Sequence, residues 1–126
     1  EWIFDMDGEQ GFRDRESKIF STLISENARA VIATGGGIIL REENRRLLLN
    51  NGLVIYLCAS SQQLFQRTRK DRKRPLLQVA DRKSVIEKLL EERDPLYRQV
   101  ADIIINSGQG RLSNLVKKLA EKILAM

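Results

Sequence analysis

Four arginines in this sequence are suited to binding a small anionic molecule: Arg13, Arg67, Arg74 and Arg93. A guanidinium stays charged in proteins, and it can donate two parallel hydrogen bonds to a carboxylate or a phosphate. Arg74 precedes Pro75, which ends a densely basic stretch, and such a break suits a mobile lid that closes over a ligand. The arginines indicate an anion-binding site, although a single arginine is more often a solvated surface charge.

Three consecutive glycines, Gly35, Gly36 and Gly37, form a second candidate ligand-binding feature. A backbone without side chains lets a ligand approach its N–H groups closely. A helix that begins shortly afterwards would favour an anion or a polar ligand nearby. A flexible turn between a strand and a helix explains the glycines equally well. No Gly-Lys-Ser/Thr follows them, so the run is not a Walker A loop.

Composition narrows the function classes. The 126 residues are 42% hydrophobic and 31% charged, which predicts one soluble globular domain. No apolar run is long enough to span a membrane, and the start at Glu1 does not resemble a signal peptide. The net charge of +5 attracts anions of any kind.

The cysteine and histidine content argues against zinc chemistry. The chain has no His, and its single cysteine, Cys58, lies in an apolar run where we expect a buried, inert thiol. Zinc ligation and His-based general base catalysis are therefore not expected. A lone thiol is consistent with a reducing cytoplasm.

Hydrophobic patterning predicts short strands separated by amphipathic helices. We predict buried strands at 31–34, 53–57 and 103–105. Residues 1–12 are interpreted as a short apolar start followed by a loop. Because the strands are apolar without alternation, we expect a parallel sheet covered by helices on both faces, with ligands at the carboxyl ends of its strands.

The helices carry recognisable end signals. We predict helices over 15–26, over 42–50 with Gly52 as its C-terminal cap, after a cap at Ser60 or Ser61, and over 112–123. Ser84 and Glu87 have capping-box spacing at the start of a further helix. That helix is expected to stop before Pro95, because a proline restricts the residue that precedes it.

Phe12-Arg13-Asp14-Arg15-Glu16 resembles the Phe-Arg-x-x-Glu element of shikimate kinases. Other elements similar to that family follow in the same order: Val31 to Gly37, Asn44-Arg45, Gly52 to Leu57, Arg67-Thr68, Asp71, Arg74 to Leu77, Arg93 to Tyr97 and Ala101-Asp102. Each element is modest, but their order and spacing together are specific. The resemblance covers nearly the whole chain and weakens after Asn106.

The resemblance implies a fold and an activity. The fold is a three-layer α/β/α parallel sheet of the P-loop, nucleoside-monophosphate-kinase type. The activity is transfer of the ATP γ-phosphoryl group to the 3-hydroxyl of shikimate, with Mg²⁺, in the cytoplasmic synthesis of chorismate and aromatic amino acids. Phosphoryl transfer depends mainly on positioning and electrostatic stabilisation, which agrees with a site built from arginines.

By the same resemblance, Arg13 and Arg93 hold the shikimate carboxylate and Glu16 orients Arg13. The backbone of Gly35, Gly36 and Gly37 binds the hydroxyl edge of the substrate.

On the nucleotide side, the resemblance implies that Arg67 lies on the adenine ring. Arg74 reaches the phosphates and stabilises the charge that develops during transfer. In the variable region after Asn106, Gln109 and Gly110 are the residues expected to touch the nucleotide.

The family also has a phosphate loop, a first central strand and an Asp-x-Asp element, which the resemblance places before Glu1. We therefore interpret residues 1–126 as a partial kinase domain, with a substrate-binding region at about 1–30 and a lid at about 67–83. No metal ligand is assigned within it, and alone it is expected to be inactive and not a stable monomer. The complete protein is expected to be a monomer. Asp5-Met6-Asp7 is interpreted as a solvated loop and not as the Asp-x-Asp element.

Three alternatives stay open. A catalytically inactive relative with a regulatory or scaffolding role would keep the same motifs. A different small-molecule kinase is disfavoured by the pairing of Arg13 with Arg93, which indicates a carboxylate substrate. A nucleic-acid-binding module would use the basic run from Arg67 to Arg74, but that run has no interleaved aromatic residue for base stacking.

Overall fold

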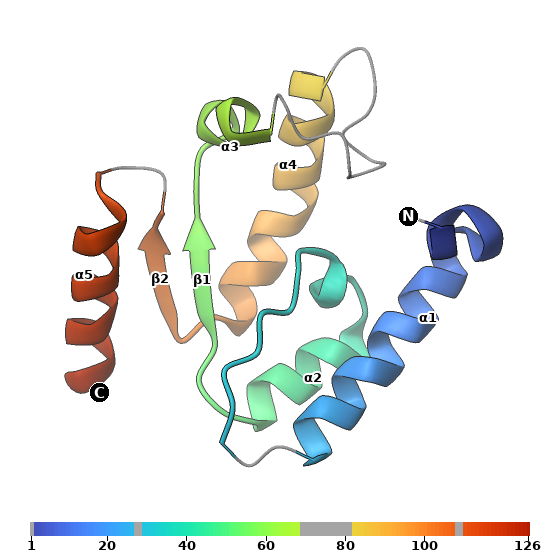
Figure 1. Ribbon diagram of the computed structural model, residues 1–126, viewed down its shortest axis with the longest axis horizontal. Coiled ribbons are helices and arrows are strands. Elements are labelled where there is room, and N and C mark those ends of the chain that lie inside the picture. The colour runs from blue at the N-terminus through green and yellow to red at the C-terminus, as the bar shows by residue number, and fades with distance from the viewer. Residues whose placement is uncertain (1, 27–28, 69–81, 108–109) are drawn as a thin grey trace. The chain divides into compact units, whose positions relative to one another are not determined.

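The computed structural model describes residues 2–26, 29–68, 82–107 and 110–126 (Figure 1). The chain forms two compact units, Glu1–Leu53 and Val54–Met126, which are described in turn. Arg74, Gln109 and most of the predicted lid lie outside the described residues. None of the described helices is both long and apolar enough to cross a membrane.

The first unit contains α1 (Trp2–Glu26), a short 3₁₀ helix η1 (Gly37–Leu40) and α2 (Glu42–Asn50). The prediction of a loop within residues 1–12 is wrong, because the chain there is helical on both sides of Gly8. Gly8 adopts φ 72° and ψ −178°, a conformation open to glycine, so the chain kinks there and the helix resumes. Asp5 and Asp7 consequently lie in a helical segment, not in a loop.

The apolar run Val31–Thr34 forms no strand, contrary to the prediction. Its side chains alternate between exposed and half-buried, and Val31 is fully exposed. A strand requires a neighbour that accepts and donates its backbone hydrogen bonds. In the described part of the chain, the only strand pair is formed elsewhere, so this run has the composition of a strand without a partner.

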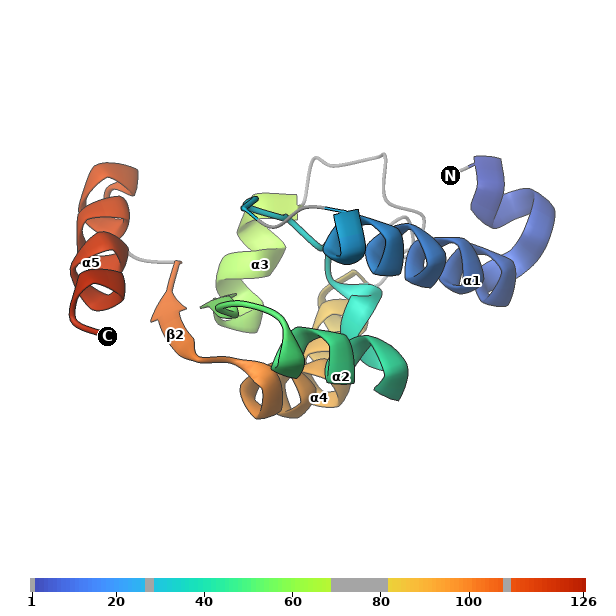
Figure 2. The ribbon, with the colours of Figure 1, turned by 90° about the horizontal axis from the view of Figure 1, so that it is seen from below.

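Helix α2 agrees with the prediction at both ends. It spans Glu42–Asn50, and Gly52 follows with φ 84°, the left-handed conformation typical of a residue just beyond a helix C-terminus. Helices α1 and α2 lie side by side in both ribbon views (Figures 1 and 2). A hydrogen bond of 3.0 Å from Asn44 Nδ2 to Ser17 Oγ joins them, and Asn44 is buried.

The second unit contains β1 (Ile55–Cys58), α3 (Ser61–Thr68), α4 (Arg82–Val100), β2 (Ile103–Asn106) and α5 (Leu112–Leu124). The two strands are parallel, with Ile55 opposite Ile103, which confirms the predicted parallel sheet. In both ribbon views, α4 lies on the β1 side of this sheet and α5 on the β2 side (Figures 1 and 2). Strand β2 is largely buried, as predicted, whereas β1 is half-buried and Leu57 is 52% exposed.

The start of α3 confirms one of the two predicted caps. The Gln63 N–H donates to Ser60 Oγ at 3.1 Å, and the Ser60 N–H donates to Gln63 Oε1 at 2.9 Å. This reciprocal pair is a capping box, in which two backbone donors at the helix start are satisfied by side chains.

Helix α4 corrects two predictions. Its described part begins at Arg82, so Ser84 lies within the helix and does not cap it. It also continues through Pro95 to Val100. A proline inside a helix costs about 3 kcal/mol through a lost hydrogen bond and steric crowding. The buried side chains of Ile86 and Val100, and polar contacts near Pro95, favour the continuous helix and offset that cost.

Candidate active site

Arg13 on α1 is the most enclosed arginine of the described residues, with 8% of its surface exposed. Its Nη1 donates to Glu16 Oε1 at 2.9 Å, and Glu9 lies 3.8 Å from Nη2. The guanidinium also stands over the ring of Phe12, with 5.1 Å between Cζ and the ring centroid. Since residues three and four apart share one face of a helix, α1 itself supplies both carboxylates.

The glycine run approaches Arg13 directly. A Cβ atom at Gly37 would lie only 2.5 Å from Arg13 Cζ, so a side chain there would displace the guanidinium. Gly35 has φ 75°, so the run turns before it reaches Arg13. The Nε–H of Arg13 is buried without a hydrogen-bond partner in the described residues. The predicted substrate residues Arg13, Glu16 and Gly37 are thus brought together within the first unit.

Two residues that the sequence analysis left without a role support this arrangement. Arg45 Nη1 donates to the carbonyl oxygen of Ile39 at 2.6 Å, which fixes the 3₁₀ turn that begins at Gly37. Asn44 ties α2 to Ser17, one helical turn after Arg13. The signal for both was present in the Asn44-Arg45 element, but an isolated dipeptide does not reveal its contacts.

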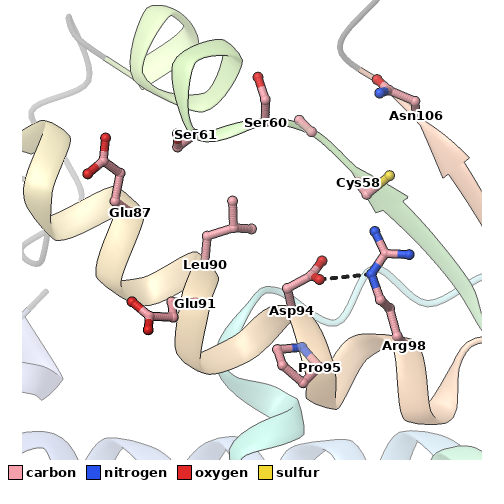
Figure 3. A pocket seen from close by; sticks show the side chains of 11 residues that line it. Cys58, Ser60, Ser61, Glu87, Leu90, Glu91, Asp94, Pro95, Arg98 and Asn106 are labelled. Carbon is pink, nitrogen blue, oxygen red and sulfur yellow. Dashed lines mark hydrogen bonds and ion pairs between the residues drawn. The ribbon is translucent and has the colours of Figure 1, made fainter.

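In the second unit, a cavity of about 540 Å³ opens where β1 and β2 end (Figure 3). Cys58 and Asn106 close the strand ends, and α4 contributes Glu87, Glu91 and Asp94. Cys58 is half-buried and lines this cavity, so the expectation of a buried thiol is not met. The carboxyl ends of parallel strands are the usual ligand-binding edge of such a sheet.

Arg93 belongs to this second unit and is half-buried on α4. It lies in the middle of the helix, and not at its end as predicted. Its neighbour Asp94 accepts hydrogen bonds from Tyr56 Oη at 2.6 Å and from Arg98 Nε at 2.8 Å. Burial raises the pKa of Asp94, but these two hydrogen bonds together outweigh it and hold the pKa below its usual value. Burial and the bond to Asp94 raise the pKa of Tyr56.

Arg67, at the end of α3, contacts the loop that follows β2. Its guanidinium donates to the carbonyl oxygen of Ser107 and, at 3.3 Å, to Ser107 Oγ. Gly110, on the far side of this loop, has φ 79° and is exposed. Arg67 therefore contacts Ser107, whereas the predicted nucleotide residue Gln109 lies outside the described residues.

Comparison with known proteins identifies the family. A family model for shikimate kinase matches residues 1–124. A shikimate kinase from Francisella tularensis subsp. holarctica is 47% identical over 119 residues, which cover 94% of this chain and 68% of that protein. One from Francisella philomiragia is 46% identical over the same length.

Comparison with solved structures identifies the same family. The chain resembles shikimate kinase from Acinetobacter baumannii in complex with shikimate, with a TM-score of 0.92 and 44% identity over 98% of this chain and 69% of that one. Shikimate kinase from Bacteroides thetaiotaomicron matches with a TM-score of 0.82 and 27% identity, over 98% of this chain and 73% of that one.

The fold is accordingly that of the P-loop, nucleoside-monophosphate-kinase class, a parallel sheet flanked by helices. The chain belongs to the shikimate kinase family, whose members are ATP-dependent kinases that act on an alcohol.

Proposed function

We propose that the protein containing this chain transfers the γ-phosphoryl group of ATP to the 3-hydroxyl of shikimate. Membership of the family and the likeness to a relative solved in complex with shikimate support this reaction. The observation that carries it is the enclosed guanidinium of Arg13, held by Glu16 and packed against Gly37. A buried cation of this kind favours a carboxylate ligand.

The substrate side of the proposal follows the resemblance to the family. Arg13 and Arg93 bind the carboxylate of shikimate, and Glu16 keeps the guanidinium of Arg13 in one orientation. The backbone of Gly35, Gly36 and Gly37 faces the hydroxyl groups of the ring. Binding the carboxylate at two arginines fixes the ring and thereby presents one hydroxyl to the nucleotide.

The nucleotide side uses the second unit. Arg67 lies on the adenine ring, with Gln109 and Gly110 beside it, and Arg74 reaches the phosphates of ATP. In the reaction, the shikimate 3-oxygen forms a bond to the γ-phosphorus while the bond from that phosphorus to the β-γ bridging oxygen breaks. ADP leaves, and the hydroxyl proton is released. Arg74 stabilises the negative charge on the transferring oxygens.

In this proposal, Mg²⁺ is bound together with ATP. Among the described residues, no group of three acidic, His or Cys side chains could hold a metal ion. No residue of this chain is therefore proposed as a magnesium ligand. The protein is proposed to act as a cytoplasmic monomer, and the chain Glu1–Met126 alone to be inactive.

Shikimate-dependent release of ADP from Mg²⁺-ATP tests the reaction, in the longest natural protein that contains this chain. Arg13→Ala should raise the KM for shikimate at least about tenfold, because a charge-assisted pair is lost. Lys18→Ala removes an exposed cation from the same helix and is the matched control. No shikimate-dependent activity in the unmutated protein would favour an inactive relative with a regulatory role.

A further inference from the structure

The turn of α4 that carries Arg93 is weakened by Pro95, which lies inside the helix. Pro95 has no N–H, so the carbonyl oxygen of Glu91 lacks its usual backbone donor. The ring also crowds the preceding turn, and helices commonly bend at such a position. Arg93 lies within this turn, so a change of bend would move its Cα.

Asp94 ties this turn to β1. Its Oδ1 accepts from Tyr56 Oη at 2.6 Å, a contact that joins the helix to the middle of the strand. Its Oδ2 accepts from Arg98 Nε at 2.8 Å, a contact that bridges Pro95 (Figure 3). Both carboxylate oxygens of Asp94 are thus engaged, one by the strand and one by a residue further along the helix.

Aromatic packing adds to the contact between β1 and α4. The rings of Tyr56 and Tyr97 lie 4.7 Å apart between centroids, inclined by 36°. The guanidinium of Arg98 stands 5.9 Å from the centroid of the Tyr56 ring. Strand β1 therefore meets α4 at three positions from 94 to 98, around Pro95.

This arrangement leaves Arg93 available to a ligand. Asp94, which directly follows Arg93, pairs with Arg98, four residues further along the helix. Among the described residues, Arg93 forms no hydrogen bond or ion pair of its own. An arginine that must meet a carboxylate bidentately needs placement within about 0.5 Å, which a helix weakened by proline does not provide alone.

We propose that Tyr56 and Asp94 are positioning residues for shikimate binding, and that they act by fixing the turn that carries Arg93. This proposal rests on the proposed function, in which Arg93 binds the carboxylate of shikimate. Neither Tyr56 nor Asp94 touches the substrate. Their effect should therefore appear in shikimate affinity and should disappear when Arg93 is absent.

The test is a double-mutant cycle in the complete protein, with the KM values for shikimate and ATP and the thermal unfolding midpoint measured for each variant. Tyr56→Phe keeps the ring and removes the hydrogen bond. It should raise the KM for shikimate about fivefold, as the loss of one hydrogen bond predicts, and change the KM for ATP less than about twofold. Asp94→Asn should act in the same direction. In an Arg93→Ala background, Tyr56→Phe should cause no further loss.

Asp102→Ala is the matched control. It removes the acceptor of the Val54 N–H, a bond of 2.8 Å just before β1, and should lower stability without changing the KM for shikimate. Equal effects of Tyr56→Phe with and without Arg93, or equal effects on both substrates, would overturn the positioning role alone. If Arg93→Ala itself leaves shikimate affinity unchanged, the carboxylate contact in the proposed function is wrong.

Discussion

The guanidinium of Arg13 lies against Gly37, so close that a Cβ atom at position 37 would overlap it. The two residues are 24 positions apart and come from different elements, the long helix α1 and the start of the 3₁₀ turn η1. A long-range contact therefore favours glycine at position 37, whereas Gly35 and Gly52 are glycines with positive φ and open space around them.

Gly37→Ala should displace the guanidinium of Arg13 and weaken shikimate binding. Because the overlap is with an arginine held by Glu16, we expect the KM for shikimate to rise at least about tenfold, comparable to the loss of a charge-assisted hydrogen bond. Steady-state kinetics of the complete protein measures this. Gly52→Ala is the control, since it strains the backbone by about 1–2 kcal/mol without approaching Arg13. A normal KM for Gly37→Ala would contradict the contact.

The Asp94 carboxyl makes the free energy of unfolding depend on pH in the acid range. Its pKa in the folded protein lies below its usual value of 3.8, so the unfolded chain binds this proton more readily. The stabilisation from Asp94 is therefore fully present above pH 3.8, and it is lost as the pH falls through the lower folded pKa. The unfolding midpoints of the complete protein and of Asp94→Asn should differ by a constant amount near neutral pH and converge in acid. A difference that widens in acid would mean that folding raises the pKa of Asp94, which contradicts the prediction.

Arg67→Ala should raise the KM for ATP and leave the KM for shikimate unchanged. The guanidinium of Arg67 reaches Ser107 from the end of α3 and so forms one side of the proposed adenine contact. We expect the KM for ATP to rise about fivefold to tenfold, as for the loss of a stacked or hydrogen-bonded arginine. Arg111→Ala removes an exposed arginine just beyond the same loop and serves as the control. An effect of Arg67→Ala on shikimate alone would remove it from the nucleotide side.

Local signals in the sequence predicted the elements whose ends are set by nearby residues. Helix α2 with Gly52, the Ser60 cap of α3 and the isoleucines of β2 all follow from residues within a few positions. The family and its arginines were also recognisable, because their order and spacing are properties of the chain itself.

Long-range contacts explain what the sequence did not predict. The passage of α4 through Pro95 is supported by Tyr56, which is 38 residues from Asp94. The run at Val31 has strand composition, but strand structure depends on a hydrogen-bonded neighbour that composition does not specify. The role of Asn44 likewise became visible only when α2 was placed against Ser17.

The capping box at Ser60 and Gln63 occupies backbone N–H groups that could otherwise bind an anion. Helix α3 begins at the carboxyl end of β1, and Ser60 lines the cavity there. A bare helix start at this edge would compete for the phosphates of the nucleotide. Here the Ser60 and Gln63 amides are already occupied by the chain's own side chains. Two of the backbone donors that an anion would use at this helix start are therefore engaged within the chain itself.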